Sequence, residues 1–352
     1  MSRGARHTAV IGATIVQRAR CRHMKPLATV VLCALVAALA AAAPALAAPT
    51  TIAALDAATE VRAYAGVQVW STYDPASKRH HLTVRRDAKL STPAIGSSKI
   101  AIEADVGPGP GGRPALAYVR CTDACRVVVT RLDGSGRQVV RGSAGASDPT
   151  ISGRQVAWVR GKATVMTSTV DGQGRKRLAG APRRKCYETA EGHTCERPRS
   201  VLVSELELHG SQLALVADFE LPGGFGSGEA ELRTESIKGG PQRLVAWMTV
   251  GEGGQSWIGP SWARGRLYYY KTCFGDPSGC ATDAGVYRFD PVTGKRAIAS
   301  SSTVLTGFAI DDDGTRAYTA SVPGFDGECR TEDAVRCLLR RTSPLRFKQL
   351  RR

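Results

Sequence analysis

Three acidic residues, Asp105, Glu205 and Glu207, stand where short apolar segments begin and are the side chains best placed to do chemistry. Carboxylates can hold a divalent cation, which in turn lowers the pKa of a bound water and makes it a nucleophile. The chain contains six histidines and its sequence has no asparagine, so ligand sets built on those residues are scarce or excluded. A metal-dependent hydrolase or lactonase would therefore have to rely on these carboxylates.

Ten cysteines are present, and the eight that follow residue 48 form four close pairs: Cys121/Cys125, Cys186/Cys195, Cys273/Cys280 and Cys329/Cys337. An even number of cysteines in an exported chain is typical of disulfide bonds. Zinc sites are the weaker alternative, because they need four converging ligands, usually with a C-x2-4-C spacing that the first pair alone approaches. We predict four disulfides, each closing its own loop.

The N-terminal region has the pattern of an export signal. Lys25 precedes an apolar run over residues 27–43, and small residues and prolines follow up to Pro49. This order predicts a Sec-type signal peptide over residues 24–48, preceded by an upstream misread start over residues 1–23. The alternative is an uncleaved membrane anchor, since the run approaches the length of a membrane span. We expect a secreted or cell-envelope (periplasmic) protein in which residues 49–60 are a linker or a closing strand.

The chain is strongly basic, with 48 Lys and Arg against 31 Asp and Glu and a net charge of +17. On an exported protein this excess favours anionic partners such as cell-wall polymers or phospholipid headgroups. The alternative is a general enrichment in arginine. No nucleic-acid recognition motif is present, so nucleic acid is not an expected partner.

From residue 61 onward the chain repeats one pattern of short β-type segments separated by Gly and Asp turns. The apolar residues that begin the second strand of each repeat are Val69, Leu116, Val156, Leu213, Leu267 and Ala317. Six units with a period of about 50 residues predict an all-β fold, a six-bladed β-propeller of four-stranded antiparallel blades over residues 61–352. A β-sandwich or two separate β domains are the alternatives.

Two details of this prediction can be checked directly. Residues 345–350 are expected to form the fourth strand of the sixth blade. The tryptophans on strand positions are expected to lie in the core between blades: Trp158, Trp247, Trp257 and Trp262.

The turn and strand motifs resemble those of a known family. Residues 311–319 read DDDGTRAYT, third strands end in DGSG and DGQG turns, and residues 107–121 read GPGPGGRPALAYVRC. This pattern resembles the TolB-type (WD-repeat-like) six-bladed β-propeller and is similar to its secreted actinobacterial members. The resemblance implies the fold and export, whereas it implies no particular partner.

In a four-stranded meander, the second-to-third loops and the links between blades share one face. All four cysteine pairs fall in such segments, as does the basic run Arg183, Arg184 and Lys185. Long loops on a rigid scaffold are common binding sites, although the bridges could equally serve to protect the loops from proteolysis. We expect a monomeric, non-catalytic binding scaffold without a cofactor, whose partner is a protein or an anionic cell-envelope polymer. The propeller hydrolase with a metal in the central channel is the alternative.

Overall fold

The structure is a computed structural model of the whole chain. Its compact unit Ala48–Arg352 contains all the strands. The residues that the structure describes are 50–182, 184–189, 192–220, 228–250, 255–273, 285–300, 305–314, 316–321, 337–341, 345 and 347–350. Among them there is no helix long and apolar enough to cross a membrane.

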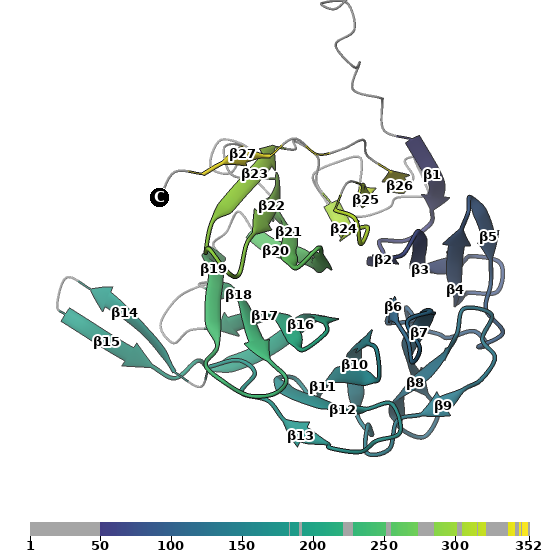
Figure 1. Cartoon of the computed structure of the whole chain (residues 1–352), viewed down its shortest axis with the longest axis horizontal. Helices are drawn as coiled ribbons and strands as arrows, with labels where there is room; N and C mark the ends of the chain where they lie inside the picture. The colour runs from purple at the N-terminus through teal and green to yellow at the C-terminus, as the bar shows by residue number, and fades with distance from the viewer. Residues whose placement is uncertain are drawn as a thin grey trace, which may run out of the picture. The chain divides into compact units, whose positions relative to one another are not determined.

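The unit is an all-β, six-bladed propeller, as the repeat predicts (Figure 1). Strands of the first three blades, from innermost to outermost, are β2 (Val61–Tyr64), β3 (Val67–Asp74), β4 (Arg79–Arg86) and β5 (Lys89–Ser91); β6 (Ala104–Pro108), β7 (Pro114–Cys121), β8 (Cys125–Arg131) and β9 (Gln138–Val139); and β10 (Ala146–Ser152), β11 (Gln155–Arg160), β12 (Thr164–Thr169) and β13 (Lys176–Arg177). Those of the last three are β16 (Ser200–His209), β17 (Gln212–Glu220), β18 (Gly228–Ser236) and β19 (Arg243–Val250); β20 (Gln255–Ala263), β21 (Arg266–Cys273), β22 (Gly285–Phe289) and β23 (Arg296–Ser300); and β24 (Leu305–Ile310), β25 (Ala317–Ser321), β26 (Cys337–Arg341) and β1 (Thr50–Leu55). All six predicted anchor residues lie on the second strand of their blade.

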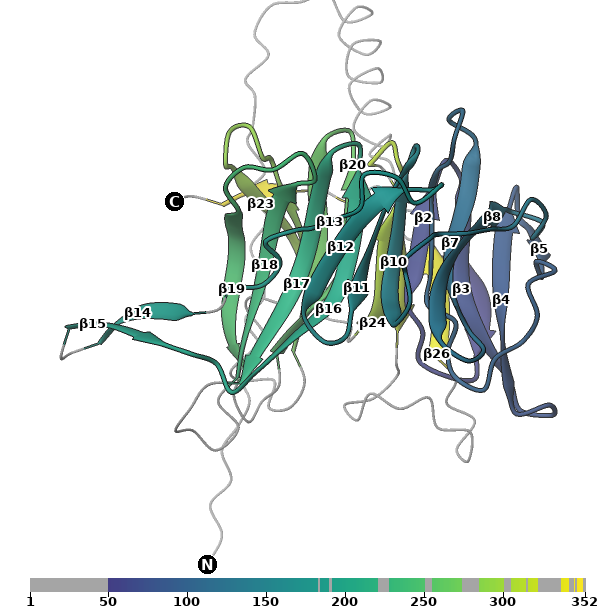
Figure 2. The same ribbon diagram turned by 90° about the horizontal axis from the view of Figure 1, so that it is seen from below.

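The innermost strands form a closed ring around the central channel. In chain order β2, β6, β10, β16, β20 and β24 each contact the next, and β24 contacts β2 (Figures 1 and 2). One further hairpin, β14 (Lys185–Thr189) with β15 (Gly192–Glu196), forms a separate two-stranded sheet between blades three and four.

The ring closes through the N-terminal strand, which corrects the prediction for residues 345–350. β1 pairs antiparallel with β26 and is the outer strand of blade six, with Leu55 opposite Cys337. β27 (Lys348–Gln349) instead pairs with β23 and extends blade five to five strands. The reason is that the edge of β26 is already occupied by β1, so the C-terminal segment pairs with the next exposed edge.

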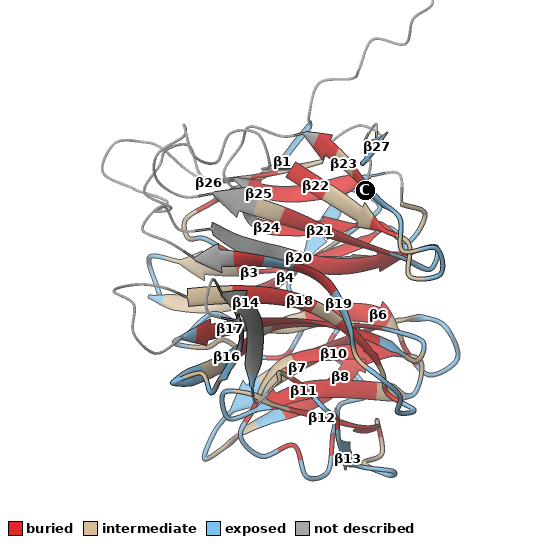
Figure 3. Cartoon of the chain, turned by 90° about the vertical axis from the view of Figure 1, so that its left-hand side faces the viewer, coloured by how far each residue is buried: buried red, intermediate tan, exposed pale blue. Residues whose placement is uncertain are grey.

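The core lies between blades, and buried residues run along their strands (Figure 3). β11 and β17 carry the runs VAWV and LALVA, which are buried on both sides because a blade packs against a neighbour on each face. Trp158 and Trp262 are buried as predicted. The prediction for Trp247 was wrong, because it lies on the outermost strand β19 and is 59% exposed; the Trp257 side chain lies outside the described residues.

Neighbouring innermost strands approach so closely that some positions require glycine. A Cβ added to Gly107 on β6 would lie 2.1 Å from the Ile151 carbonyl oxygen on β10. One added to Gly259 on β20 would lie 2.0 Å from the Phe308 carbonyl oxygen on β24. Gly259 also has a φ of +59°, a conformation that other residues adopt only with strain. These contacts hold the polar side chains of adjacent innermost strands within hydrogen-bonding reach.

Candidate functional site

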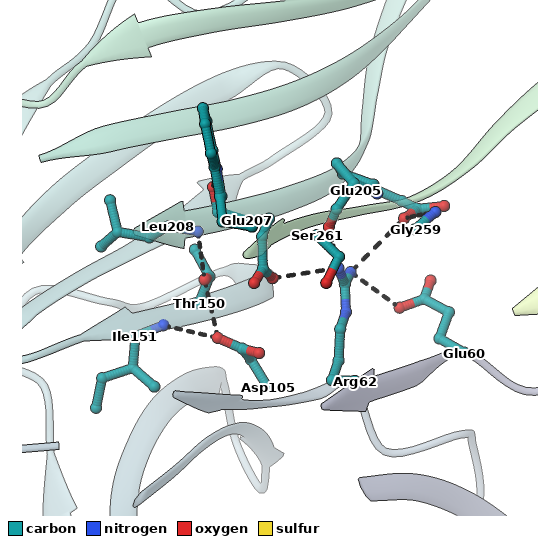
Figure 4. Close-up of polar contacts among 12 residues, drawn as sticks. Glu60, Arg62, Asp105, Thr150, Ile151, Glu205, Glu207, Leu208, Gly259 and Ser261 are labelled. Carbon is teal, nitrogen blue, oxygen red and sulfur yellow. Dashed lines mark hydrogen bonds and ion pairs between the residues drawn. The ribbon is translucent and has the colours of Figure 1, made fainter. Parts of the chain in front are cut away.

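The buried arginine Arg62 joins three segments that line the channel. Arg62 on β2 is 6% exposed, and its guanidinium faces carboxylates from two other segments (Figure 4). Its Nη2 lies 3.4 Å from Glu60 Oε2 and 3.7 Å from Glu205 Oε2, and its Nη1 lies 3.5 Å from Glu207 Oε2. Nη1 also donates a hydrogen bond to the Pro260 carbonyl oxygen on β20 at 3.4 Å. Arg62 therefore ties β2 to β16 and β20 across the channel.

Two of the predicted carboxylates bind backbone of the next blade. Asp105 on β6 accepts hydrogen bonds at 2.9 Å from the Ile151 amide and from the Thr150 hydroxyl, both on β10 (Figure 4). Glu205 on β16 accepts one at 2.7 Å from the Gly259 amide on β20. These amides lie on the channel edge of a sheet, where no further strand is available to satisfy them.

Hydroxyl groups make the same connection at two other junctions. The Thr150 hydroxyl accepts a hydrogen bond from the Leu208 amide of β16 at 2.9 Å. The Ser261 hydroxyl on β20 accepts one from the Ile310 amide of β24 at 3.3 Å. Together with Asp105 and Glu205, they join five consecutive innermost strands through side chains.

Bulges in the innermost strands accompany these contacts. The register shifts between Ser147 and Thr150 in β10, between Val203 and Glu205 in β16, and between Ile258 and Ser261 in β20. A bulge bends its strand and redirects the side chains beside it. The bulges therefore lie next to the residues that face the channel.

One cation faces an excess of carboxylates, and this imbalance sets the protonation of the cluster. Burial would lower the pKa of Arg62, but Glu60, Glu205 and Glu207 raise it above its usual value, so the guanidinium keeps its charge. Burial and the charge of Glu60 raise the pKa of Glu205 to about 8. Burial and the charge of Asp105 raise the pKa of Glu207 well above its usual range. Because one guanidinium cannot neutralise all of these carboxylates, some of them are neutralised by binding a proton instead.

Two further carboxylates lie where the blade-two and blade-three strands enter the channel. Glu103 Oε2 accepts a hydrogen bond from the Asp148 amide at 2.8 Å. Asp148 has a φ of +45° and precedes Pro149, and burial together with Glu60 and Glu103 raises its pKa to about 8. Burial also raises the pKa of Glu103.

The donor set does not fit a divalent cation at the centre of the channel. A metal needs several oxygens that converge on one empty point, but the guanidinium of Arg62 already lies among Glu60, Glu205 and Glu207. Asp105 and Glu205 each have one oxygen bound to a backbone amide of the next blade. In the part of the chain that the structure describes, no group of three or more His, Cys, Asp or Glu side chains has metal-binding geometry.

We expect the protein to lose stability as the pH rises from 5 to 8.5. The raised pKa values of Glu205 and Asp148 mean that the folded state keeps protons that the unfolded chain releases above about pH 4.5. The contribution of these two groups is therefore fully present below that pH and is lost as the pH approaches 8, by at least about 2 kcal/mol, since each unit of pKa difference contributes about 1.4 kcal/mol. Urea unfolding at the two pH values measures the change.

Glu205→Gln removes the titrating proton while its carbonyl oxygen can still accept the Gly259 amide, so the pH slope should become shallower. Asp123→Asn, on an exposed loop residue, is the matched control and should leave the slope unchanged. Burial lowers the pKa of His80 and His209, so these two groups make stability rise with pH. The test is therefore the difference in pH slope between each variant and the unaltered protein. A slope that is identical in Glu205→Gln and in the unaltered protein would contradict this account.

The structure brings together the three carboxylates named from the sequence and adds residues that sequence reasoning missed. Asp105, Glu205 and Glu207 all lie in the channel. Arg62, Glu60 and Asp148 were not predicted. Their signal is positional, because Arg62 and Asp148 stand in the innermost strands β2 and β10, and Glu60 directly precedes β2.

Of the predicted disulfides, the structure describes Cys121–Cys125, with an S–S distance of 2.06 Å between β7 and β8. Cys195 and Cys337 are also disulfide-bonded, and Cys195 stands opposite Cys186 in the β14–β15 hairpin. Cys280 and Cys329, with the side chains of Cys186 and Cys273, lie outside the described residues, so three of the predicted pairings stay predictions. Of the basic run, Arg184 is exposed, and Arg183 and the side chain of Lys185 lie outside the described residues.

The Cys121–Cys125 bridge borders a groove of about 620 Å³ between blades one and two. One wall is the link between the blades, residues 95–103, and the other is the end of β7 with the disulfide hairpin. The basic side chains Arg79, Lys99 and Arg120 line it. The described part of the loop face therefore has a hollow with basic walls.

Comparison with solved structures shows the fold. The chain is similar to the α-L-arabinofuranosidase Arb93A from Fusarium graminearum, solved with an iminosugar inhibitor, with a TM-score of 0.50 and 10% identity over 85% of this chain and 98% of that one. A chain of the mitotic checkpoint complex matches with a TM-score of 0.46 and 9% identity over 86% and 96%. A puromycin-hydrolysing peptidase of Mycobacterium tuberculosis matches with 0.45 and 13% over 84% of this chain and 53% of that one, so this chain spans about half its length.

No protein-family model matches the chain, and no curated protein matches its sequence. The similar structures combine low identity with different activities and assemblies, and such likeness carries information about the fold alone. The chain is a six-bladed β-propeller.

Proposed function

We propose that this protein is an exported, non-catalytic β-propeller that binds a protein or a cell-envelope polymer through its loop face. The observation that carries the proposal is the position of Arg62 among Glu60, Glu205 and Glu207. The predicted channel carboxylates, Asp105, Glu205 and Glu207, are engaged with this guanidinium or with backbone amides of the next blade. Their arrangement serves to hold the blades together.

The features of the loop face favour a binding function over hydrolysis in the channel. Loops that project from a rigid scaffold are common binding sites, and the described part of this face has a disulfide-closed hairpin beside a groove with basic walls. The basic run Arg183, Arg184 and Lys185 lies in the link after blade three. Export through the signal at residues 24–48, a monomeric state and membership of the secreted TolB-like group belong to the same proposal.

The second candidate is a propeller hydrolase or lactonase that uses the channel. It is favoured by the raised pKa values of Glu205 and Asp148, because strongly shifted carboxyl groups often mark catalytic sites. Buried ion-pair networks shift pKa values in the same way, and here the network is visible around Arg62. A metal-dependent form of this candidate would require Arg62 to leave the carboxylates.

A basic-face variant tests the proposed function. Replacing Arg183, Arg184 and Lys185 together with serine is expected to weaken binding to an acidic cell-envelope polymer, measured by co-sedimentation with purified wall material. Exposed charges are screened over about 10 Å at 0.1 M salt, so binding of the unaltered protein should fall steeply as salt rises. The melting temperature should stay unchanged, since Arg184 is exposed and exposed charges contribute little to folding.

The matched control removes three exposed arginines from turns at the opposite ends of the strands: Arg86, Arg113 and Arg131. It has the same net charge as the basic-face variant and should bind as the unaltered protein does. Equal loss of binding in both variants would show that generic positive charge is responsible, and would overturn the role of the loop face.

A further inference from the structure

The groove between blades one and two has a wall that hydrogen bonds hold in place before any ligand binds. Its wall of residues 95–103 is fixed to blade one by several hydrogen bonds. Arg79 donates to the Ser97 hydroxyl at 2.5 Å and to the Ser97 carbonyl oxygen at 3.1 Å. His80 and Ser98 exchange two backbone hydrogen bonds, at 2.7 and 2.9 Å. A wall that is already ordered reduces the conformational entropy lost when a ligand binds.

The opposite wall is equally constrained. The Val119 amide on β7 donates to the Glu103 carbonyl oxygen at 3.0 Å, which fixes the width of the groove at its inner end. At its outer end, the disulfide between Cys121 and Cys125 closes the hairpin. The two walls therefore hold their spacing without a ligand.

The charges in the groove are predominantly positive. Lys99 and Arg120 are exposed, and Arg79 is partly buried in the first wall. Glu103 supplies the one carboxylate among the lining residues, all of which are described, and its Oε2 accepts the Asp148 amide. Lysine and arginine side chains on both walls favour a ligand with more than one anionic group.

The remaining lining groups indicate what carries those anionic groups. Ile100 is 63% exposed and presents an apolar surface, and Ser97, Thr122 and Ser147 add hydroxyl groups to the lining of the groove. A volume of about 620 Å³ is in the range of about 300–1,000 Å³ typical of organic ligands. Nucleic-acid strands are held by stacking on exposed aromatic rings, whereas Tyr118, the one aromatic among these described lining residues, is buried.

We propose that this groove binds a segment of an anionic glycan, a chain whose sugar rings pack on Ile100 while its carboxylate or phosphate groups pair with Lys99 and Arg120. The inference rests on the proposed function and assigns its ligand class and its place on the loop face. Arg79 and Ser97 form the rigid wall against which the chain lies.

Isothermal titration calorimetry of the full chain tests the proposal. The probes are hexagalacturonate as a carboxylate chain, a glycerol-phosphate oligomer as a phosphate chain, maltohexaose as a neutral chain and inorganic phosphate as a free anion. We expect one of the anionic chains to bind, and maltohexaose and inorganic phosphate to bind at least tenfold more weakly. Which anionic chain binds identifies the source of the charge.

Two variants locate the site. Lys99→Gln with Arg120→Gln should weaken binding about tenfold, because it removes charge from both walls. Ile100→Ser should weaken it without changing the salt dependence. The control Arg113→Gln with Arg131→Gln removes two exposed arginines at the other ends of the strands and should leave the affinity within twofold.

Three outcomes would overturn the groove assignment: undiminished binding by the Lys99 and Arg120 variant, equal binding of maltohexaose, or binding of vesicles rich in phosphatidylglycerol in place of both anionic chains. If binding is lost in the Arg183, Arg184 and Lys185 variant but not in the groove variant, the groove assignment fails and the proposed function stands. If the unaltered protein cleaves a probe, the proposed function fails, and the groove is judged by affinity alone.

Discussion

Replacing Arg62 with methionine is expected to lower the free energy of unfolding by about 3–5 kcal/mol, the usual cost of removing one partner of a buried ion pair. The variant keeps the length of the side chain but leaves the buried carboxyl groups of Glu205 and Glu207 without the guanidinium that both contact. It also removes the donor to Pro260 that joins β2 to β20. Chemical denaturation at pH 7 measures the loss.

The matched control is Arg154→Met, which breaks the exposed pair of Arg154 with Asp171, 3.2 Å apart. Exposed ion pairs contribute about 0–1 kcal/mol, so this variant should be nearly neutral. Adding Glu207→Gln to the Arg62 variant should recover part of the loss, since one fewer buried carboxyl group is then left without its guanidinium partner. A loss in Arg62→Met no larger than in Arg154→Met would contradict the account of the channel.

Replacing Leu55 with aspartate is expected to destabilise the protein by at least about 4 kcal/mol, because it combines a lost buried side chain with a buried charge. Leu55 is 2% exposed and packs with Val61, Trp70 and Leu339, on three different strands at the junction of blades six and one. Since β1 closes the ring, disrupting it should affect the whole domain. The unfolding transition should stay single and move to lower denaturant concentration.

Ala54→Asp is the control, because Ala54 is the neighbouring residue on β1 and its side chain is exposed. It should change stability by less than about 0.5 kcal/mol, as surface substitutions usually do. If Leu55→Asp is as stable as Ala54→Asp, the ring does not depend on β1 for its closure.

The sequence predicts the repeat well because each blade is a local unit with its own turns. Val69, Leu116 and Val156 mark second strands with runs of consecutive buried residues, a pattern that can be recognised without knowledge of the neighbouring blades. Which segment completes the last blade is a different question, since residues 50–55 and 345–350 both suit an edge strand. Only the closed ring decides between them, and it selects β1.

The site is predicted less completely, for a physical reason. Asp105, Glu205 and Glu207 could be named because acidic residues were expected at the starts of innermost strands, although β16 begins earlier, at Ser200. Arg62 was missed because arginine is abundant in this chain, and its role follows from contacts with residues 143 and 145 positions away, Glu205 and Glu207. For Trp247 the strand position was predicted correctly and the burial was not. Its side chain is exposed because β19 is the outermost strand of its blade.

The most direct test of the central claim, that the channel is a structural ion-pair network and the protein a binding scaffold, is its metal content. The full chain, purified without chelators, is dialysed against calcium, magnesium, manganese or zinc and analysed by mass spectrometry, with melting temperature as a second readout. The account predicts no stoichiometric divalent ion and no rise in melting temperature, because Arg62 lies where the ion would bind. One tightly held ion per chain, lost in Glu207→Gln, would contradict it and favour the hydrolase.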